Sequence, residues 1–120
     1  LFMPVVGNFY RGLAVTVPLA FGQLAGGSDG KSIQRALAQR YEGERFIRVM
    51  PLSDPATLES GGFFDVMGAN DSNRVDIFVF ANDSQALLMA RLDNLGKGAS
   101  GAAVQAMNVH LGVDEGLGLS

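Results

Sequence analysis

Large and small side chains alternate along residues 12–19, and this period of two predicts a half-buried β-strand. Pro18 near its end indicates an edge strand or a strand end, because proline has no N–H to donate to a neighbouring strand. Residues 31–41 instead repeat apolar side chains at helical spacing, and Asp29 before them is a suitable N-cap. The first third of the chain therefore predicts a strand followed by a capped helix.

The rest of the pattern predicts further strands and a second helix. We expect short strands at residues 46–50 and 63–67, and an antiparallel hairpin formed by residues 74–80 and 85–92. A final helix is expected over residues 98–111. Its core-facing stripe should consist of Val104, Met107 and Leu111. Together these elements predict the α+β class, a mostly antiparallel mixed sheet with the helices packed on one face.

The composition limits the classes of protein to which the chain can belong. Its 120 residues fit a single domain with one hydrophobic core. The net charge of −3 argues against a nucleic-acid partner, because a phosphate backbone requires a basic surface. The lack of cysteine excludes a disulfide, a cysteine-ligated zinc site and a thiol nucleophile within these residues. No apolar run reaches membrane-spanning length, so we expect no membrane partner and a cytoplasmic location.

Residues 94–101 combine a polar turn with the glycine-rich start of the final helix. A helix that begins at glycines presents unpaired N–H groups and the positive end of its dipole, which suits a phosphate or another anion. The same glycines also suit a tight corner in which they only allow close packing. The residues alone leave both interpretations open.

Two other features are weighed as sites of chemistry. Residues 25–32 approach the P-loop pattern and precede a helix, but Ala25 stands where the first loop glycine belongs. A flexible loop before a capped helix explains them without a nucleotide. His110 is the single histidine and so a candidate acid or base, yet no carboxylate precedes it at helical spacing to orient it. A structural or solvent-facing histidine is the favoured interpretation.

The segment from the last strand into the final helix carries a long resemblance to a known family. The residues that carry it are Asp93, Asn94, Leu95, Lys97, Gly98, Ala99, Gly101, Ala103, Val104, Gln105, Met107 and Asn108. This stretch resembles the C-terminal part of the N-acetyl-gamma-glutamyl-phosphate reductase family. The resemblance implies a semialdehyde-dehydrogenase C-terminal-domain fold.

The beginning of the chain carries a second part of the resemblance. The family segment Phe-x-Pro-His-Leu-x-Pro-Met-x-Arg-Gly is matched by Phe2, Pro4, Arg11 and Gly12. Val5 stands at the position of the family's catalytic histidine. With this change, residues 4–12 resemble a second, shorter branch of the family. The acid–base residue of the family therefore has no assigned equivalent here.

The resemblance implies an NADP-dependent reductase of arginine biosynthesis that converts N-acetyl-glutamyl phosphate to its semialdehyde and phosphate. In that family a cysteine thiolate forms a thioester, phosphate leaves, and NADPH supplies the hydride. Because this sequence has no cysteine, we expect residues 1–120 to be a C-terminal substrate and dimerisation domain of a longer two-domain enzyme. The nucleophile and the Rossmann domain would then lie outside the sequence.

The resemblance also implies roles for individual residues. The expected substrate-binding residues are Arg11, Asn70 and Lys97. For Arg11, a surface salt bridge at the end of the strand is the alternative interpretation. The expected cofactor-binding residues are Asn94, Gly98 and Gly101. No catalytic residue and no metal site are expected in the chain, and the family implies a homo-oligomer, either a dimer or a tetramer.

Two questions remain open at the level of the sequence. Arg48, Asn73 and Arg74 are further candidates for a site or a subunit interface, and surface polar residues near turns are the alternative. The alternative function is a stand-alone α+β ligand-binding or regulatory module without catalysis.

Overall fold

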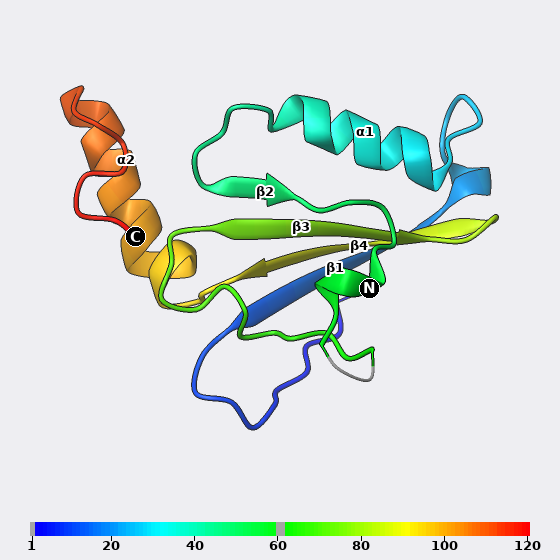
Figure 1. The fold of residues 1–120 in the computed structure, drawn as a ribbon, viewed down its shortest axis with the longest axis horizontal. Helices are drawn as coiled ribbons and strands as arrows, with labels where there is room; N and C mark the ends of the chain where they lie inside the picture. Colours follow the sequence, from blue (N-terminus) through cyan, green and yellow to red (C-terminus); the bar gives the residue numbers. More distant parts are fainter. Residues whose placement is uncertain (1, 60–61) are drawn as a thin grey trace.

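The computed structural model describes residues 2–59 and 62–120 (Figure 1). The strands of these residues are β1 (Leu13–Ala20), β2 (Ile47–Val49), β3 (Val75–Ala81) and β4 (Gln85–Leu92). Their α-helices are α1 (Gly30–Arg40) and α2 (Gly101–Leu111), and a π-helical turn, Gly96–Ser100, leads into α2. Short 3-10 turns lie at Phe21–Gln23 and Pro55–Thr57. The predicted α+β class is confirmed.

The strands form one mixed sheet in the order β1-β4-β3-β2. β4 pairs antiparallel with β1 and β3, whereas β2 runs parallel to β3. β1 lies at an edge of the sheet, as Pro18 predicts. The predicted hairpin joins β3 to β4, and its turn is fixed by Asn82, whose Oδ1 accepts the N–H groups of Ser84 (3.0 Å) and Gln85 (3.0 Å).

Aromatic side chains pack on one face of the sheet. Phe78 of β3 is 1% exposed, and its ring meets that of Phe64 edge-on with 5.0 Å between the centroids. Phe80 stacks beside Phe78 with 6.2 Å between the centroids. Since Phe64 belongs to the long connection between β2 and β3, this connection covers the aromatic face.

The helix α1 packs against β2 and β3. Its first residue, Gly30, is buried, and a Cβ there would collide with the side chain of Ala81 at the end of β3. Asp29 caps the helix as predicted, because its Oδ1 accepts the N–H of Ser32 (2.7 Å) while its own N–H donates to the Ser32 hydroxyl (2.9 Å). Ala81 and Phe78 point to opposite faces of β3, so α1 and the aromatic cluster lie on opposite sides of the sheet.

The second helix, α2, extends beyond the end of the sheet (Figure 1). The π-helical turn after β4 is too short to bring α2 back over a sheet face. Met107 is 53% exposed and Leu111 is 63% exposed, so the expected core-facing stripe is wrong. The C-terminal tail instead folds along α2, where Nδ2 of the buried Asn108 donates to the carbonyl oxygens of Glu115 (3.1 Å) and Leu117 (2.9 Å).

Residues 63–67 do not form the predicted strand. Phe63 makes one isolated bridge with Glu59, and the residues after it form irregular backbone and turns. Asp65 accepts the N–H of Met67 through its side chain (2.8 Å), a local bond that competes with strand pairing. None of the helices in the described residues combines the length and apolar character that crossing a bilayer requires. The same residues hold no group of three or more acidic or histidine side chains placed to bind a metal ion.

Candidate functional site

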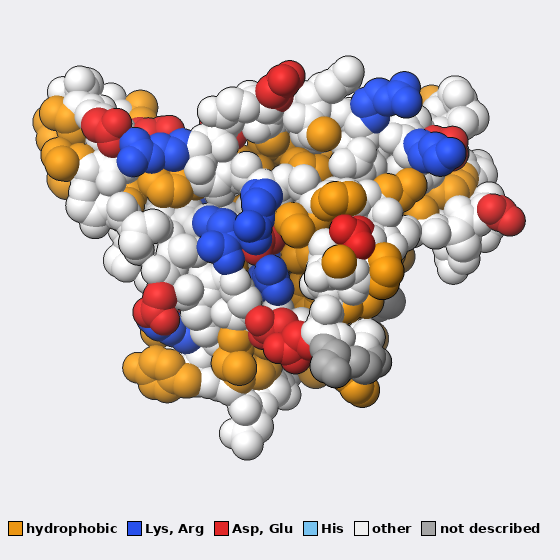
Figure 2. All heavy atoms as spheres, in the orientation of Figure 1, with side chains coloured by type: hydrophobic (Ala, Val, Ile, Leu, Met, Phe, Trp, Pro, Cys, Tyr) orange, Lys and Arg blue, Asp and Glu red, His pale blue; other side chains and the backbone are white. Residues whose placement is uncertain are grey.

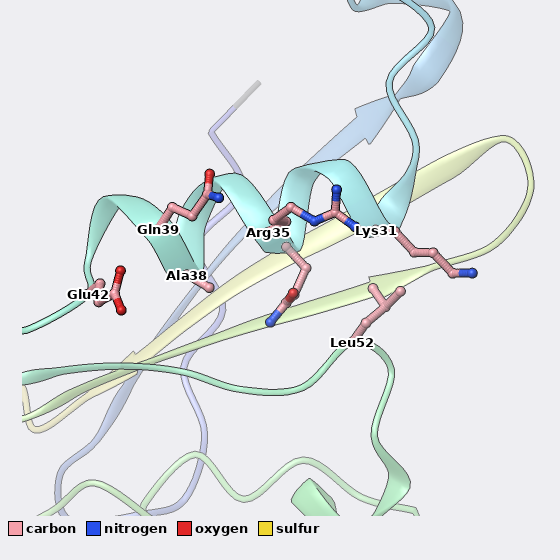
Figure 3. Close-up of a pocket in the computed structure, with 7 residues that line it drawn as sticks. Lys31, Arg35, Ala38, Gln39, Glu42 and Leu52 are labelled. Carbon is pink, nitrogen blue, oxygen red and sulfur yellow. The ribbon is translucent and has the colours of Figure 1, made fainter.

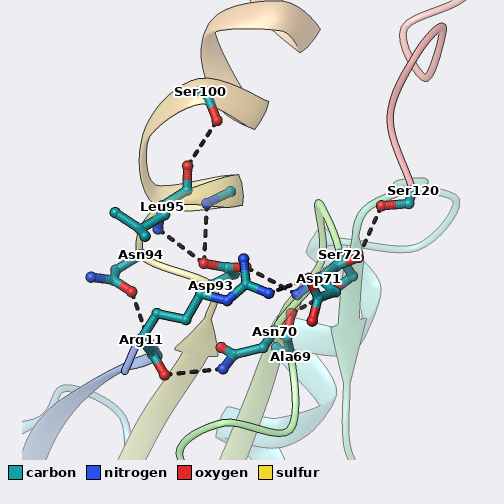
Figure 4. Close-up of polar contacts among 12 residues, drawn as sticks. Arg11, Ala69, Asn70, Asp71, Ser72, Asp93, Asn94, Leu95, Ser100 and Ser120 are labelled. Carbon is teal, nitrogen blue, oxygen red and sulfur yellow. Dashed lines mark hydrogen bonds and ion pairs between the residues drawn. The ribbon is translucent and has the colours of Figure 1, made fainter. Parts of the chain in front are cut away.

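Asp93 lies at the end of β4 and joins segments that are far apart in the sequence (Figure 4). Its side chain is almost fully buried; Oδ1 accepts the N–H groups of Leu95 (3.0 Å) and Gly96 (3.1 Å), and Oδ2 accepts that of Asp71 (3.0 Å). Burial alone would raise the pKa of Asp93, but these three N–H groups and the charge of Arg11 lower it below the ordinary value. The ionised carboxylate therefore caps the helical segment that follows.

Arg11 enters the same corner from the segment before β1. Its guanidinium forms an ion pair with Asp71, and its Nη1 lies 3.4 Å from Oδ2 of Asp93. The hydrogen bond to Asp71 raises the pKa of Arg11 above its ordinary value. The side chain is 25% exposed, so a permanently charged fork is held at the surface of the corner.

Two asparagines fix the backbone at Arg11. Oδ1 of Asn94 accepts the N–H of Gly12 (2.8 Å), and Nδ2 of Asn70 donates to the carbonyl oxygen of Arg11 (3.0 Å) (Figure 4). Gly12 has a φ of +130°, and a Cβ there would lie 2.9 Å from the carbonyl oxygen of Val66, so the position requires glycine. The structure thus brings together Arg11, Asn70 and Asn94, three of the residues proposed from the sequence.

The glycine-rich helix start does not present the free N–H groups expected at Gly98 and Gly101. The N–H of Gly98 donates to the carbonyl oxygen of Asp93 (2.8 Å), and that of Gly101 donates to the carbonyl oxygen of Gly96. The helical segment begins earlier than predicted, and the Asp93 carboxylate already occupies the place of an anion at its N-terminus. Gly101 is buried against Asn73, where a Cβ would collide with Oδ1. The close-packing interpretation therefore explains Gly101.

The glycines at 96, 98 and 101 have the spacing of a dinucleotide-binding loop, Gly-x-Gly-x-x-Gly, after a strand and before a helix. The structure forms a π-helical turn there, and no strand follows α2 among the described residues. The βαβ unit in which that loop binds a pyrophosphate is therefore missing at this place. The glycine spacing therefore matches that of a dinucleotide-binding loop, but the backbone conformation does not.

Two hollows flank Arg11. One of about 430 Å³ is lined by Val5, Arg11 and Asn94 together with their neighbours. The other, of about 250 Å³, lies between Arg11, Asp93 and Asn73, whose buried Oδ1 has no hydrogen-bond partner within the described residues. Val5, at the position of the family's histidine, thus shares a hollow with the arginine fork and the Asn94 amide.

Lys97 has different neighbours from Arg11. Its Nζ donates to Oε1 of Gln105 and lies 5.6 Å from the centroid of the Phe46 ring. These contacts hold the half-buried side chain against the start of α2 and the beginning of β2. A substrate-binding role for Lys97 therefore requires it to leave Gln105.

The loop before α1 does not form a phosphate cradle. The carboxylate of Asp29 takes the N–H of Ser32, the position that a phosphate would need. The hollow of about 440 Å³ beside α1 runs along the side of the helix from Lys31 to Glu42 (Figure 3). His110 is exposed on α2. The interpretations without a nucleotide and without a catalytic histidine are favoured by this geometry.

Three aspartates organise this end of the sheet but were not proposed as site residues from the sequence: Asp71, Asp76 and Asp93. Asp93 entered only as a residue that carries the family resemblance. Asp93 is followed by Asn-Leu-Gly, and an aspartate before such a turn is a recognisable capping signal. Asp76 lies within a strand with apolar residues on both sides. A charge at such a position signals a buried partner, but the sequence does not say which residue that partner is.

The fold and the site around Arg11 define a class of protein: a small mixed α+β domain in which the guanidinium of Arg11 lies at the surface and the amides of Asn70 and Asn94 hold its backbone. The described residues include no nucleophilic cysteine and no dinucleotide-binding unit.

Comparison with known proteins agrees with that class. A family model described as the dimerisation domain of semialdehyde dehydrogenase matches residues 1–94, and the chain belongs to this family. It is 51% identical over 121 aligned positions to N-acetyl-gamma-glutamyl-phosphate reductase 2 of Nostoc sp., covering 99% of this chain and 38% of that protein. The identity to the reductase of Trichormus variabilis is also 51%, with the same coverage. For the reductase of Burkholderia ambifaria it is 42%, covering 94% of this chain and 36% of that protein.

Proposed function

We propose that the chain is the C-terminal substrate and dimerisation domain of an NADP-dependent N-acetyl-gamma-glutamyl-phosphate reductase. The observation that carries the proposal is the 51% identity to reductases across 99% of the chain. The chain spans about 38% of the length of these relatives. The other domain would supply the cysteine and most of the cofactor site, and a cytoplasmic location goes with this proposal.

In the proposed reaction, the cysteine thiolate displaces phosphate from the acyl phosphate, and the resulting thioester is reduced to the aldehyde. NADPH would supply the hydride. The role of this chain is to bind and orient. The partly exposed guanidinium of Arg11, which also pairs with Asp71 and Asp93, suits bidentate contact with a carboxylate or phosphate oxygen pair of the substrate. Asn70 supports this by holding the Arg11 carbonyl (3.0 Å).

The residues near Asn94 fit one edge of a nicotinamide nucleotide. The Oδ1 of Asn94 is taken by Gly12, which leaves the amide NH₂ of this exposed side chain available to an acceptor. Gly98 to Ser100 are exposed and small, so a flat group can approach the backbone closely there. The proposal therefore keeps Asn94 and Gly98 as cofactor contacts, and gives Gly101 the supporting role of close packing.

We also propose a homo-oligomer that uses one face of β1. Leu13, Val15 and Val17 are 40–48% exposed and point to the same side of the sheet. Directly opposite them on β4 lie Leu92, Ala90 and Leu88. This continuous apolar strip at the sheet edge suits a second copy of the chain, in agreement with the dimerisation domain named by the family model.

The exposed apolar side of α2 suits the other domain of the proposed enzyme. Met107 and Leu111, which lie one turn apart on the same side of the helix, are both more than half exposed. Burial of these apolar side chains against a partner would stabilise the helix further. The nucleotide-binding domain of the full-length enzyme is the partner that we propose for α2.

The test is an assay of the full-length protein that contains this chain. We expect phosphate-dependent reduction of NADP⁺ with N-acetyl-glutamate semialdehyde as substrate, followed by absorbance of the reduced cofactor. Omission of phosphate should abolish turnover. A full-length protein that binds ligands but shows no turnover would contradict the proposal and favour the ligand-binding or regulatory module.

A further inference from the structure

A second group of charged side chains lies on the sheet around Asp76. Arg48 on β2 and Arg91 on β4 are the residues directly opposite Asp76 on its two neighbouring strands. The Nε atoms of Arg48 (3.0 Å) and Arg74 (2.9 Å) both donate to Oδ1 of Asp76. Nη2 (2.8 Å) and Nε (3.3 Å) of Arg91 donate to Oδ2. One carboxylate therefore accepts from three guanidinium groups.

Arg91 alone is sufficient to neutralise Asp76. Asp76 is fully buried and Arg91 is 7% exposed, and two nitrogens of Arg91 donate to the same oxygen, Oδ2, of Asp76. Arg91 is held further by the carbonyl oxygen of Asp65 (2.8 Å) and by the ring of Phe78, whose centroid lies 5.0 Å away. Arg48 and Arg74 thus bring positive charge in excess of what the buried carboxylate needs.

The excess charge is directed outward. The side chain of Arg48 is 52% exposed and that of Arg74 is 34% exposed. Within the described residues, neither Nη1 nor Nη2 of Arg48 has a hydrogen-bond acceptor. Of the two Nη atoms of Arg74, only Nη2 has one, the carbonyl oxygen of Gly68 (2.5 Å). Figure 2 shows basic side chains gathered in one group over the sheet.

Nearby acidic groups compensate only part of this charge. Asp65 is a further carboxylate beside Arg91, since a Cβ at Gly68 would touch both side chains. Its Oδ1 accepts the N–H of Met67 (2.8 Å), and no ion pair joins it to Arg48 or Arg74 in the part of the chain that the structure describes. Arg11 belongs to a different pair of carboxylates, Asp71 and Asp93. Two guanidinium groups held against one oxygen repel each other, and an anion between their free ends would relieve that repulsion.

We propose that Arg48 and Arg74 form a binding site for an oxyanion, the carboxylate or phosphate group of a small molecule. Because both Nε atoms share Oδ1 of Asp76, the two guanidinium groups lie side by side and are fixed before the ligand arrives. Oxygens of the ligand accept the free Nη–H groups of Arg48 and of Arg74. A guanidinium edge matches the oxygen pair of either group in a bidentate arrangement. This site does not depend on the reductase proposal.

The test is a titration of the chain at low ionic strength with inorganic phosphate and, in a separate arm, with glutarate. NMR of the arginine Nε–H groups should show saturable shifts at Arg48 and Arg74. Arg48→Gln should weaken binding about tenfold or more, the effect of losing charge-assisted hydrogen bonds. Arg40→Gln on the exposed face of α1 is the matched control and should leave the affinity unchanged. Circular dichroism checks the fold of each variant.

The two arms separate the sources of the oxyanion. Tighter binding of phosphate assigns a phosphorylated ligand, and tighter binding of glutarate assigns a carboxylic acid. Shifts that do not saturate with either anion, or that spread over all arginines alike, would overturn the proposal. An equal loss of affinity in Arg40→Gln and Arg48→Gln would overturn it as well. If Arg48→Gln does not fold, the localisation of the shifts in the unsubstituted chain decides the question.

Discussion

Asp93 combines a local role with a long-range one. Its Oδ1 caps the helical segment after β4, while its Oδ2 accepts the N–H of Asp71 and faces Arg11. The helix start, the turn at residues 70–73 and the arginine fork therefore depend on one buried carboxylate. A substitution at Asp93 should disturb all three together.

The Asp93→Asn variant should be less stable than the unsubstituted chain at neutral pH by about 1–3 kcal/mol. The amide cannot accept all of the N–H groups that meet the carboxylate, and Arg11 loses a charged partner. Urea unfolding measures the difference. Asp83→Asn, in the exposed turn between β3 and β4, is the control and should have little effect.

The pH dependence of this difference follows from the lowered pKa of Asp93. A carboxylate with a lowered folded-state pKa contributes its stabilisation fully above the unfolded-state pKa, about 4. The contribution is lost as the pH falls through the lower folded-state pKa. The gap between the two proteins should therefore narrow in acid; a gap of constant size down to about pH 3 would argue against an ionised Asp93.

Arg11 is the residue with the most direct proposed role in substrate binding. In the proposed full-length reductase, Arg11→Gln should raise KM for the semialdehyde roughly tenfold or more, because a charge-assisted bidentate contact is lost. The effect on kcat should be smaller. Steady-state kinetics measures both, with Arg40→Gln as the control. A variant that loses stability but keeps its KM would mean that Arg11 serves only the ion pairs with Asp71 and Asp93.

At the scale of elements, β1 has two different faces. Leu13, Val15 and Val17 form an exposed apolar row on one side, while Thr16 points to the other. An exposed apolar row on an edge strand favours association with another chain. The pairing of β1 with β4 uses only the backbone, so the side chains of this row remain free to contact a partner.

The double substitution Val15→Asp and Val17→Asp should weaken the proposed dimer roughly a hundredfold or more, because it buries unpaired carboxylates at the interface. Thr16→Asp adds a charge to the opposite face of the same strand and should leave association intact. Sedimentation velocity over a range of concentrations distinguishes the two. Equal dissociation in both variants would place the interface elsewhere.

At the scale of the whole molecule, the chain lacks the groups that the proposed chemistry needs. It contains no cysteine, so it cannot form the thioester by itself. We predict that the 120-residue chain alone has no reductase activity in the phosphate-dependent assay with NADP⁺. As a control, the purified chain is added to the full-length enzyme, whose turnover should be unchanged if the preparation of the chain contains no inhibitor. Turnover by the chain alone, above the buffer background, would refute the prediction.

Much of the fold could be predicted because its signals are local. The alternation in residues 12–19, the capping pair Asp29 and Ser32, and the hairpin around Asn82 each depend on neighbours a few residues away. The strand expected at residues 63–67 failed because Asp65 bonds the backbone locally and the segment serves as a cover for Phe78. A local sequence pattern does not show which residues are buried by segments that are distant in the sequence.

The candidate site divides in the same way. The sequence by itself determined the family resemblance and the lack of a thiol, and it offered Arg11, Asn70 and Asn94 as candidates, because residue identity fixes which chemistry is available. Only the tertiary structure decided that Asp93 occupies the N-terminus of the glycine-rich helical segment, where the sequence suggested an outside anion. It also decided that three arginines meet at Asp76. The physical reason is that a buried carboxylate must find its donors wherever the strands and turns bring them, and strand register sets that, not spacing along the chain.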